Sequence, residues 1–129
     1  MILLDTNFLI RSLIKDSQEA SWILQWMKTD QRFVTSSLCW YEFLCGPVND
    51  QQIALVSNII EKNFADVTQA TSTIAAKLWN SIGRNRNHRF DSLIAASAIE
   101  HNFELATSNL TDFKLFQPYG LKLVNEFSS

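Results

Sequence analysis

Short apolar runs alternate with helical stretches along the whole chain, and this alternation limits the possible fold more than any other feature of the sequence. Strand-like runs lie at 2–4, 32–36, 64–68, 103–107 and 121–124. Between them, apolar residues recur three and four positions apart, which is the spacing of an amphipathic helix. Strands that alternate with helices predict an α/β domain whose central, mainly parallel sheet is flanked by helices.

The second predicted helix shows the pattern most clearly. Asp16 is expected to begin it, with Glu19 three residues later completing a capping box. Its predicted core stripe has the helical spacing and consists of Ala20, Ile23, Leu24 and Met27. Trp22 and Trp26 lie four residues apart and off that stripe. They are expected either to face a partner or to lie beneath another element of the chain, whereas Trp79 is expected in the core.

The composition is typical of one folded domain covering residues 1–129. Hydrophobic residues make up 47% of the 129 residues, and only 3 Gly and 2 Pro are present, which argues against a sandwich or barrel of many short strands. The formal charge of -2 excludes a protein that coats nucleic acid through bulk charge. Cys39 and Cys45 are poorly spaced for a disulfide, which is typical of a cytoplasmic protein. No apolar run approaches the about 18 residues of a membrane span.

Four of the acidic residues are embedded in apolar sequence. They are Asp5 in LLDTNFLI, Glu42 in CWYEFLC, Asp91 in RFDSLIAA and Asp112 in LTDF. A carboxylate that is partly buried is costly unless it is paired or binds a metal. A hard divalent cation with oxygen ligands would satisfy all four. Asp5 and Asp112 also follow predicted strands, so parallel pairing would bring both to one edge of the sheet.

Each acid taken alone has a simpler explanation. Asp5 and Asp91 both lie where a helix can begin, so either could be an N-cap. Glu42 could be a glutamate on a helix surface, and Asp112 could cap a turn. The metal-site interpretation therefore depends on the four acids occurring together.

In the segments MILLDTNFLI, CWYEFLCG and RFDSLIAASAIEHNFELATSNLTDF, the chain resembles the PIN-domain ribonucleases. In size and layout it is similar to the VapC-type toxins of bacterial toxin–antitoxin pairs. The resemblance implies a three-layer PIN-like fold. It also implies catalytic and metal-binding roles for the four acids, with Asn109 as a further candidate ligand where many relatives carry an acid. Thr6 and Ser108 match hydroxyl positions that support the site.

The activity implied by the resemblance is hydrolysis of RNA phosphodiester bonds with Mg²⁺ or Mn²⁺, leaving a 5′-phosphate and a 3′-hydroxyl. The implied partners are the RNA substrate, a cognate antitoxin protein and a second copy of the chain. Trp22 and Trp26 would then belong to a protein interface.

One dense basic run, RNRNHR, comes immediately before Asp91. Arg84, Arg86, His88 and Arg89 could guide RNA phosphates, or the run could be an ordinary solvated loop. Two rival functions stay open. A noncatalytic binding domain would keep the fold without activity. A phosphotransfer domain would use Asp5 as the phosphate acceptor, but it would want a second acid close to Asp5 in sequence and a lysine near the last strands.

Overall fold

A computed structural model describes residues 1–124, and a five-stranded sheet forms its centre. The strands are β1 (Ile2–Leu4), β2 (Phe33–Ser36), β3 (Phe64–Ala65), β4 (Glu104–Ala106) and β5 (Lys122–Leu123). Their order across the sheet is β3-β2-β1-β4-β5, and each pair of neighbours is parallel. The parallel α/β architecture predicted from the alternation of strands and helices is therefore confirmed.

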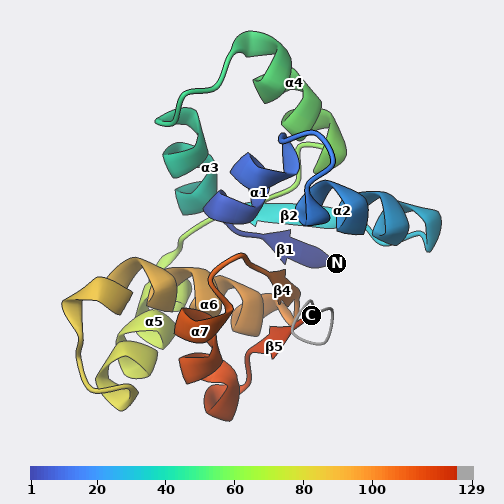
Figure 1. Cartoon of the computed structure of the whole chain (residues 1–129). Coiled ribbons are helices and arrows are strands. Elements are labelled where there is room, and N and C mark those ends of the chain that lie inside the picture. Colours follow the sequence, from blue (N-terminus) through green and yellow to red (C-terminus); the bar gives the residue numbers. More distant parts are fainter. Residues whose placement is uncertain (125–129) are drawn as a thin grey trace.

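Helices cover both faces of this sheet, so the fold has three layers (Figure 1). One layer holds α1 (Thr6–Ser12), α2 (Gln18–Lys28) and α4 (Asp50–Ile59), and the other holds α5 (Gln69–Ser81), α6 (Arg89–His101) and α7 (Leu110–Phe113). The α3 helix (Ser37–Leu44) follows β2 directly and lies at the end of the strands beside α1 (Figure 1). Two short 3-10 helices complete the fold, η1 (Arg86–His88) and η2 (Lys114–Tyr119). Within residues 1–124, no helix is both long and apolar enough to cross a membrane.

The apolar core is divided by the sheet into two clusters. Successive strand residues point to opposite faces, so Leu3 packs into one cluster while Ile2 and Leu4 pack into the other. The α3 helix contributes to both, through Cys39 on one side and Phe43 on the other. This helix, which carries Glu42, is therefore anchored in both clusters.

The first strand lies at the point where the direction of the chain through the sheet changes. From β1 the chain passes to β2 on one side, and β4 later returns to pair on the other side. Parallel sheets bind ligands beyond the carboxyl ends of the strands at such a switch point. The pairing of Leu4 with Ala106 places the next residues, Asp5 and Thr107, side by side at that edge.

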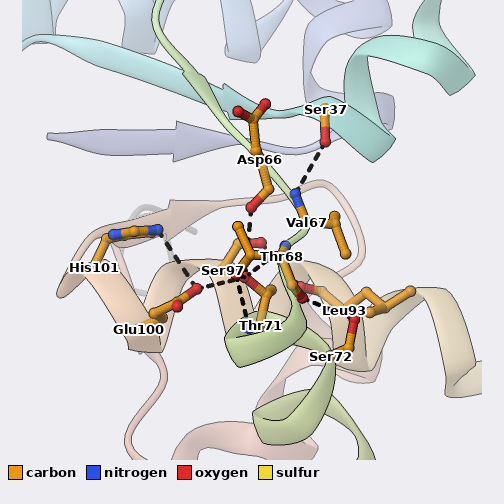
Figure 2. A network of polar contacts seen from close by, with 10 residues as sticks. All are labelled: Ser37, Asp66, Val67, Thr68, Thr71, Ser72, Leu93, Ser97, Glu100 and His101. Atoms are coloured by element: carbon orange, nitrogen blue, oxygen red, sulfur yellow. Dashed lines mark hydrogen bonds and ion pairs between the residues drawn. The ribbon is translucent and has the colours of Figure 1, made fainter.

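A network of polar contacts fixes the layer that contains α6 (Figure 2). The buried hydroxyl of Thr71 donates to Glu100 Oε1 at 2.6 Å and so joins α5 to α6. Thr68 caps α5 with its side chain, and the neighbouring Val67 N–H donates to Ser37 Oγ at 3.3 Å. These contacts connect α6 to both α5 and the start of α3, and α6 carries Asp91 (Figure 2).

The structure corrects the prediction for α2. Asp16 adopts a left-handed backbone with φ of 64° and lies outside the helix, so Ser17 is the N-cap and accepts from Ala20 N–H. Glu19 forms no capping box with Asp16. The residues of α2 that face the interior of the domain have helical spacing. They are Glu19, Trp22, Ile23 and Trp26.

The prediction that Trp22 and Trp26 lie off the core face of α2 is wrong. Both are half-buried and stack on Phe8, with ring centroids 6.1 Å away for Trp22 and 5.8 Å away for Trp26. Leu24 and Met27, which the spacing predicts in the core, are 61% and 50% exposed. The broad indole rings bury more apolar surface against Phe8 than the aliphatic residues could, which decides the face that α2 turns inward.

Candidate active site

Asp5 is the most deeply buried of the four predicted acids, with an exposure of 3%. Its Oδ1 accepts from Phe8 N–H at 2.9 Å, so it caps α1, and its Oδ2 accepts a hydrogen bond from Thr107 Oγ1. The pKa of Asp5 is raised to about 6. Burial is the largest cause, the two hydrogen bonds oppose it, and the negative charges of Asp91 and Glu42 add to it. Asp5 is thus both a helix cap and part of a charged cluster.

Glu42 and Asp91 are each oriented by a neighbouring side chain. Thr6 Oγ1 donates to Glu42 Oε1 at 3.3 Å, as expected for a supporting hydroxyl. Asp91 Oδ2 lies 3.1 Å from His88 Nδ1. The pKa of Asp91 is raised, mainly by burial, while His88 opposes the change and the charge of Asp112 adds to it.

One cavity of about 220 Å³ collects most of these groups. Its lining includes Asp5, Thr6, Glu42, Asp91 and Asn109. Asp112 is absent from this lining, but its carboxylate belongs to a tight group with Asp91 and His88, whose ligand atoms all lie within 4.8 Å of one another. The structure therefore brings the predicted acids into one neighbourhood, with Asp91 as the member shared by the cavity and the group at its side.

Asp91 does not act as the helix cap that its sequence context allowed. Because α6 begins at Arg89 and has His88 at the N-cap position, Asp91 is already the third residue of the helix. Asp112 likewise lies inside the first turn of α7 and caps nothing with its side chain. For these two acids, the simpler explanation from sequence is wrong.

On the β4 side, the hydroxyl that contacts Asp5 is that of Thr107, whereas the resemblance pointed to Ser108 as a supporting hydroxyl. Ser108 Oγ turns away and donates to Glu19 Oε2 at 2.9 Å. Thr107 Oγ1 contacts Asp5 and also accepts from Asn109 N–H at 2.9 Å. A signal for Thr107 was present in the sequence, since it directly follows a strand just as Asp5 does.

Glu19 is a buried carboxylate that the sequence did not single out. It lines a second, more open cavity, and its Oε2 pairs with Arg11 Nε at 3.0 Å. Burial pushes the pKa of Glu19 upward, but its own backbone N–H, Ser108 and Arg11 outweigh this, so the pKa lies below its ordinary value. Because Arg11 pairs with this carboxylate and Ser108 donates a hydrogen bond to it, Glu19 stabilises the α1–α2 contact instead of extending the acidic cluster.

The three arginines of the basic run are exposed, and two of them pack on Trp79, which is half-buried and lies outside both core clusters. The guanidinium carbons of Arg84 and Arg89 lie 4.8 and 5.1 Å from the ring centroid of Trp79. Trp79 Nε1 also donates to Asn85 O at 2.7 Å. The expectation of a core role for Trp79 is wrong, because the ring organises the loop before Asp91.

The oxygen-rich donor set fits a hard divalent cation. Asp5, Glu42 and Asp91 line one cavity, and Asn109 lines it as well. Burial is the main cause of the raised pKa of Asp5, and the nearby negative charges of Asp91 and Glu42 raise it further. A cation such as Mg²⁺ or Mn²⁺ prefers oxygen ligands of this kind and would relieve the repulsion.

Three comparisons with known proteins bear on this site. The family model for the PIN domain matches residues 2–116. Comparison with curated proteins by sequence found no match. Among solved structures, the chain is similar to FitAcB from Neisseria gonorrhoeae, with 18% identity and a TM-score of 0.71, covering 95% of this chain and 96% of that one.

Two further structures are similar at somewhat higher identity. VapBC-1 from nontypeable Haemophilus influenzae is 23% identical with a TM-score of 0.70, and the match covers 95% of this chain and 96% of that one. A toxin–antitoxin complex from Klebsiella pneumoniae is 25% identical with a TM-score of 0.67, covering 88% of this chain and 90% of that one. Because the family model spans the chain from the first strand to beyond Asp112, this chain belongs to the PIN-domain family.

Proposed function

We propose that this chain is a metal-dependent endoribonuclease and the VapC-type toxin of a toxin–antitoxin pair. The observation that carries the proposal is the convergence of Asp5, Glu42 and Asp91 on one cavity, with Asp112 beside Asp91. Membership in the PIN-domain family supports a nuclease, and the toxin–antitoxin complex at 25% identity supports the biological setting.

The four acids would hold the cation, with Asn109 as a weaker additional ligand because an amide oxygen carries no charge. A bound divalent cation supplies an activated water and offsets the charge of the scissile phosphate. The protein fixes the carboxylates beforehand: Phe8 N–H and Thr107 hold Asp5, Thr6 holds Glu42, and His88 holds Asp91. An ionised carboxylate at this site can also accept the proton that the attacking water loses.

The function is tested directly by RNA cleavage with and without metal. Purified protein should cut RNA in the presence of Mg²⁺ or Mn²⁺ and stop when a chelator is added, because the carboxylates alone cannot neutralise the phosphate charge. Cleavage products are followed on a denaturing gel, and re-addition of the metal should restore activity. Unchanged cutting in excess chelator would contradict the metal mechanism, and no cutting with either metal would favour a noncatalytic domain.

The phosphotransfer alternative finds no support at this site. That chemistry would need a lysine close to Asp5. Among residues 1–124, no lysine lines the cavity that contains Asp5. Lys114, the candidate considered near the last strands, lies in η2 and is exposed.

RNA would approach over the basic run, because phosphate contacts dominate the affinity of proteins for nucleic acids. Arg84, Arg86 and Arg89 are exposed beside the helix that carries Asp91, whereas His88 is turned toward Asp91 itself. Changing the three arginines to glutamine should weaken RNA binding and flatten its dependence on salt. Binding isotherms at several salt concentrations measure this, and an unchanged slope would reduce the run to a solvated loop.

An antitoxin segment would bind on the outer side of α2. Leu24 and Met27 line an apolar hollow of about 330 Å³ together with Leu55, which is 52% exposed on α4. Exposed apolar residues gathered in one hollow are typical of a protein interface. An amphipathic segment of the antitoxin fits such a groove through its apolar face. The tryptophans predicted at the interface lie on the opposite, inward side of α2 and would support it from beneath.

Introducing a charge into this hollow should show whether the antitoxin binds to the hollow or to the tryptophans. Leu24→Glu and Met27→Glu should each weaken antitoxin binding by roughly tenfold or more, with little change in the melting temperature of the free chain. Ile14→Glu is the matched control, because Ile14 is 54% exposed and does not line the hollow. Trp26→Ser should instead lower the melting temperature. Full antitoxin affinity in both groove variants would exclude this surface.

A further inference from the structure

We propose that Phe90 is a stacking platform for one unpaired base of the RNA, next to the bond that is cut. The inference rests on the proposed ribonuclease function and names the form of RNA that the site accepts, a single strand or loop. Phe90 is the second residue of α6 and comes directly before Asp91.

The position of the Phe90 ring is not explained by folding. Its exposure is 59%, and it belongs to neither core cluster. Other phenylalanines, such as Phe8 and Phe113, are fully enclosed and pack against neighbouring rings. Phe90 makes no ring contact with an aromatic residue of the described part of the chain, so its faces are available to a ligand.

The same ring lines the carboxylate cavity, together with Asp5, Glu42 and Asp91. In RNA, each base is attached to a ribose whose neighbouring groups are backbone phosphates. When the scissile phosphate lies at the carboxylates, a flanking base therefore falls near the rim where Phe90 lies. Aromatic side chains bind splayed bases of single-stranded RNA by stacking, whereas bases inside a duplex are already stacked on one another.

Asparagine amides around the cavity supply the polar half of a base-binding site. Asn7 and Asn87 are exposed and line the cavity beside Phe90. Within residues 1–124, the side-chain amide of Asn87 donates no hydrogen bond, and only the backbone N–H of Asn87 is engaged, by Asn85. An amide presents both a donor and an acceptor, which is the combination that reads the edge of a base.

The kinetic test compares Phe90→Leu with Phe90→Tyr on a short single-stranded oligoribonucleotide. Leucine keeps an apolar side chain but loses the flat ring, so KM should rise by roughly tenfold or more while kcat stays close to that of the wild type. Tyrosine keeps the ring and should restore KM. Tyr119→Leu is the control, because Tyr119 is also exposed but does not line the cavity. A KM in Phe90→Leu equal to that of the wild type would overturn the proposal.

A fluorescent base gives a readout that a structural role would not change. Oligoribonucleotides with 2-aminopurine at successive positions and cleavage-resistant phosphorothioate linkages are bound to the protein in the presence of Mg²⁺. Stacking on Phe90 should quench one position in the wild type and in Phe90→Tyr, and this quench should be lost in Phe90→Leu. An equal quench in Phe90→Leu would overturn the proposal. So would a Phe90→Leu change that affects only antitoxin binding. A wild-type chain that neither cuts nor binds RNA would instead overturn the proposed function itself.

Discussion

Asp91→Asn is expected to lower kcat/KM for RNA cleavage by roughly a hundredfold or more, while the metal-free protein stays folded. Asp91 is shared between the cavity with Asp5 and Glu42 and the group with His88 and Asp112, so its loss disrupts both halves of the site. It is the third residue of α6 and caps nothing, so asparagine costs the helix little. Removing its charge also removes one of the smaller contributions to the raised pKa of Asp5, which burial mainly causes.

Thermal melting shows whether this loss arises from metal binding. Mn²⁺ at a hundredfold excess over its dissociation constant should stabilise the wild type by about 2.7 kcal/mol, and Asp91→Asn should lose most of that gain. Asp50→Asn is the control, because it removes the same charge from the first turn of α4, away from the cavity. An Asp91→Asn protein that remains active and gains as much stability from Mn²⁺ would show that Asp91 is no ligand.

In the absence of metal, Asp5 is expected to make the protein less stable as the pH rises from about 4 to 6. The folded protein holds the Asp5 proton up to a pKa of about 6, whereas the unfolded chain loses it near 3.8. Stability from this group is therefore complete below the lower value and is lost as the pH passes the higher one. The loss amounts to about 3 kcal/mol in the free energy of unfolding.

The measurement is denaturant unfolding in chelator at several pH values, for the wild type and for Asp5→Asn. Asparagine keeps an oxygen that can accept from Phe8 N–H but carries no charge. Asp5→Asn should therefore be more stable than the wild type at pH 7, and the difference should shrink toward pH 4. Parallel pH profiles for the two proteins would contradict the burial of a destabilising carboxylate at this position.

The sequence predicted the sheet and the acids because both depend on local rules. Apolar runs mark buried strands, and residues that follow parallel strands share one edge, so the order of residues is enough to place Asp5 there. Thr6 contacts Glu42, and its supporting role stays a prediction. Asp112 lies beside Asp91 but not in the lining of the cavity, a distinction that strand order alone could not make.

The wrong predictions concern which way a helix face or a side chain points, and tertiary contacts decide this. The spacing of apolar residues in α2 allowed two inward faces, and Phe8 selected the one with Trp22 and Trp26. Thr107 and Ser108 are adjacent hydroxyl residues that point to different partners. Pattern alone cannot choose between such neighbours, because the choice depends on the pairing of β4 with β1.

The pairing of β1 with β4 also determines when, during synthesis, the chain can acquire an active site. Leu4 and Ala106 are register partners, so nearly the whole chain must emerge from the ribosome before Asp5 can meet Thr107. Contacts between residues so distant in sequence form late in folding. A nascent chain that has exposed only α1 to α5 holds Asp5 and Glu42 but lacks Asp91 and Asp112. An incomplete chain therefore lacks the assembled cluster of acids.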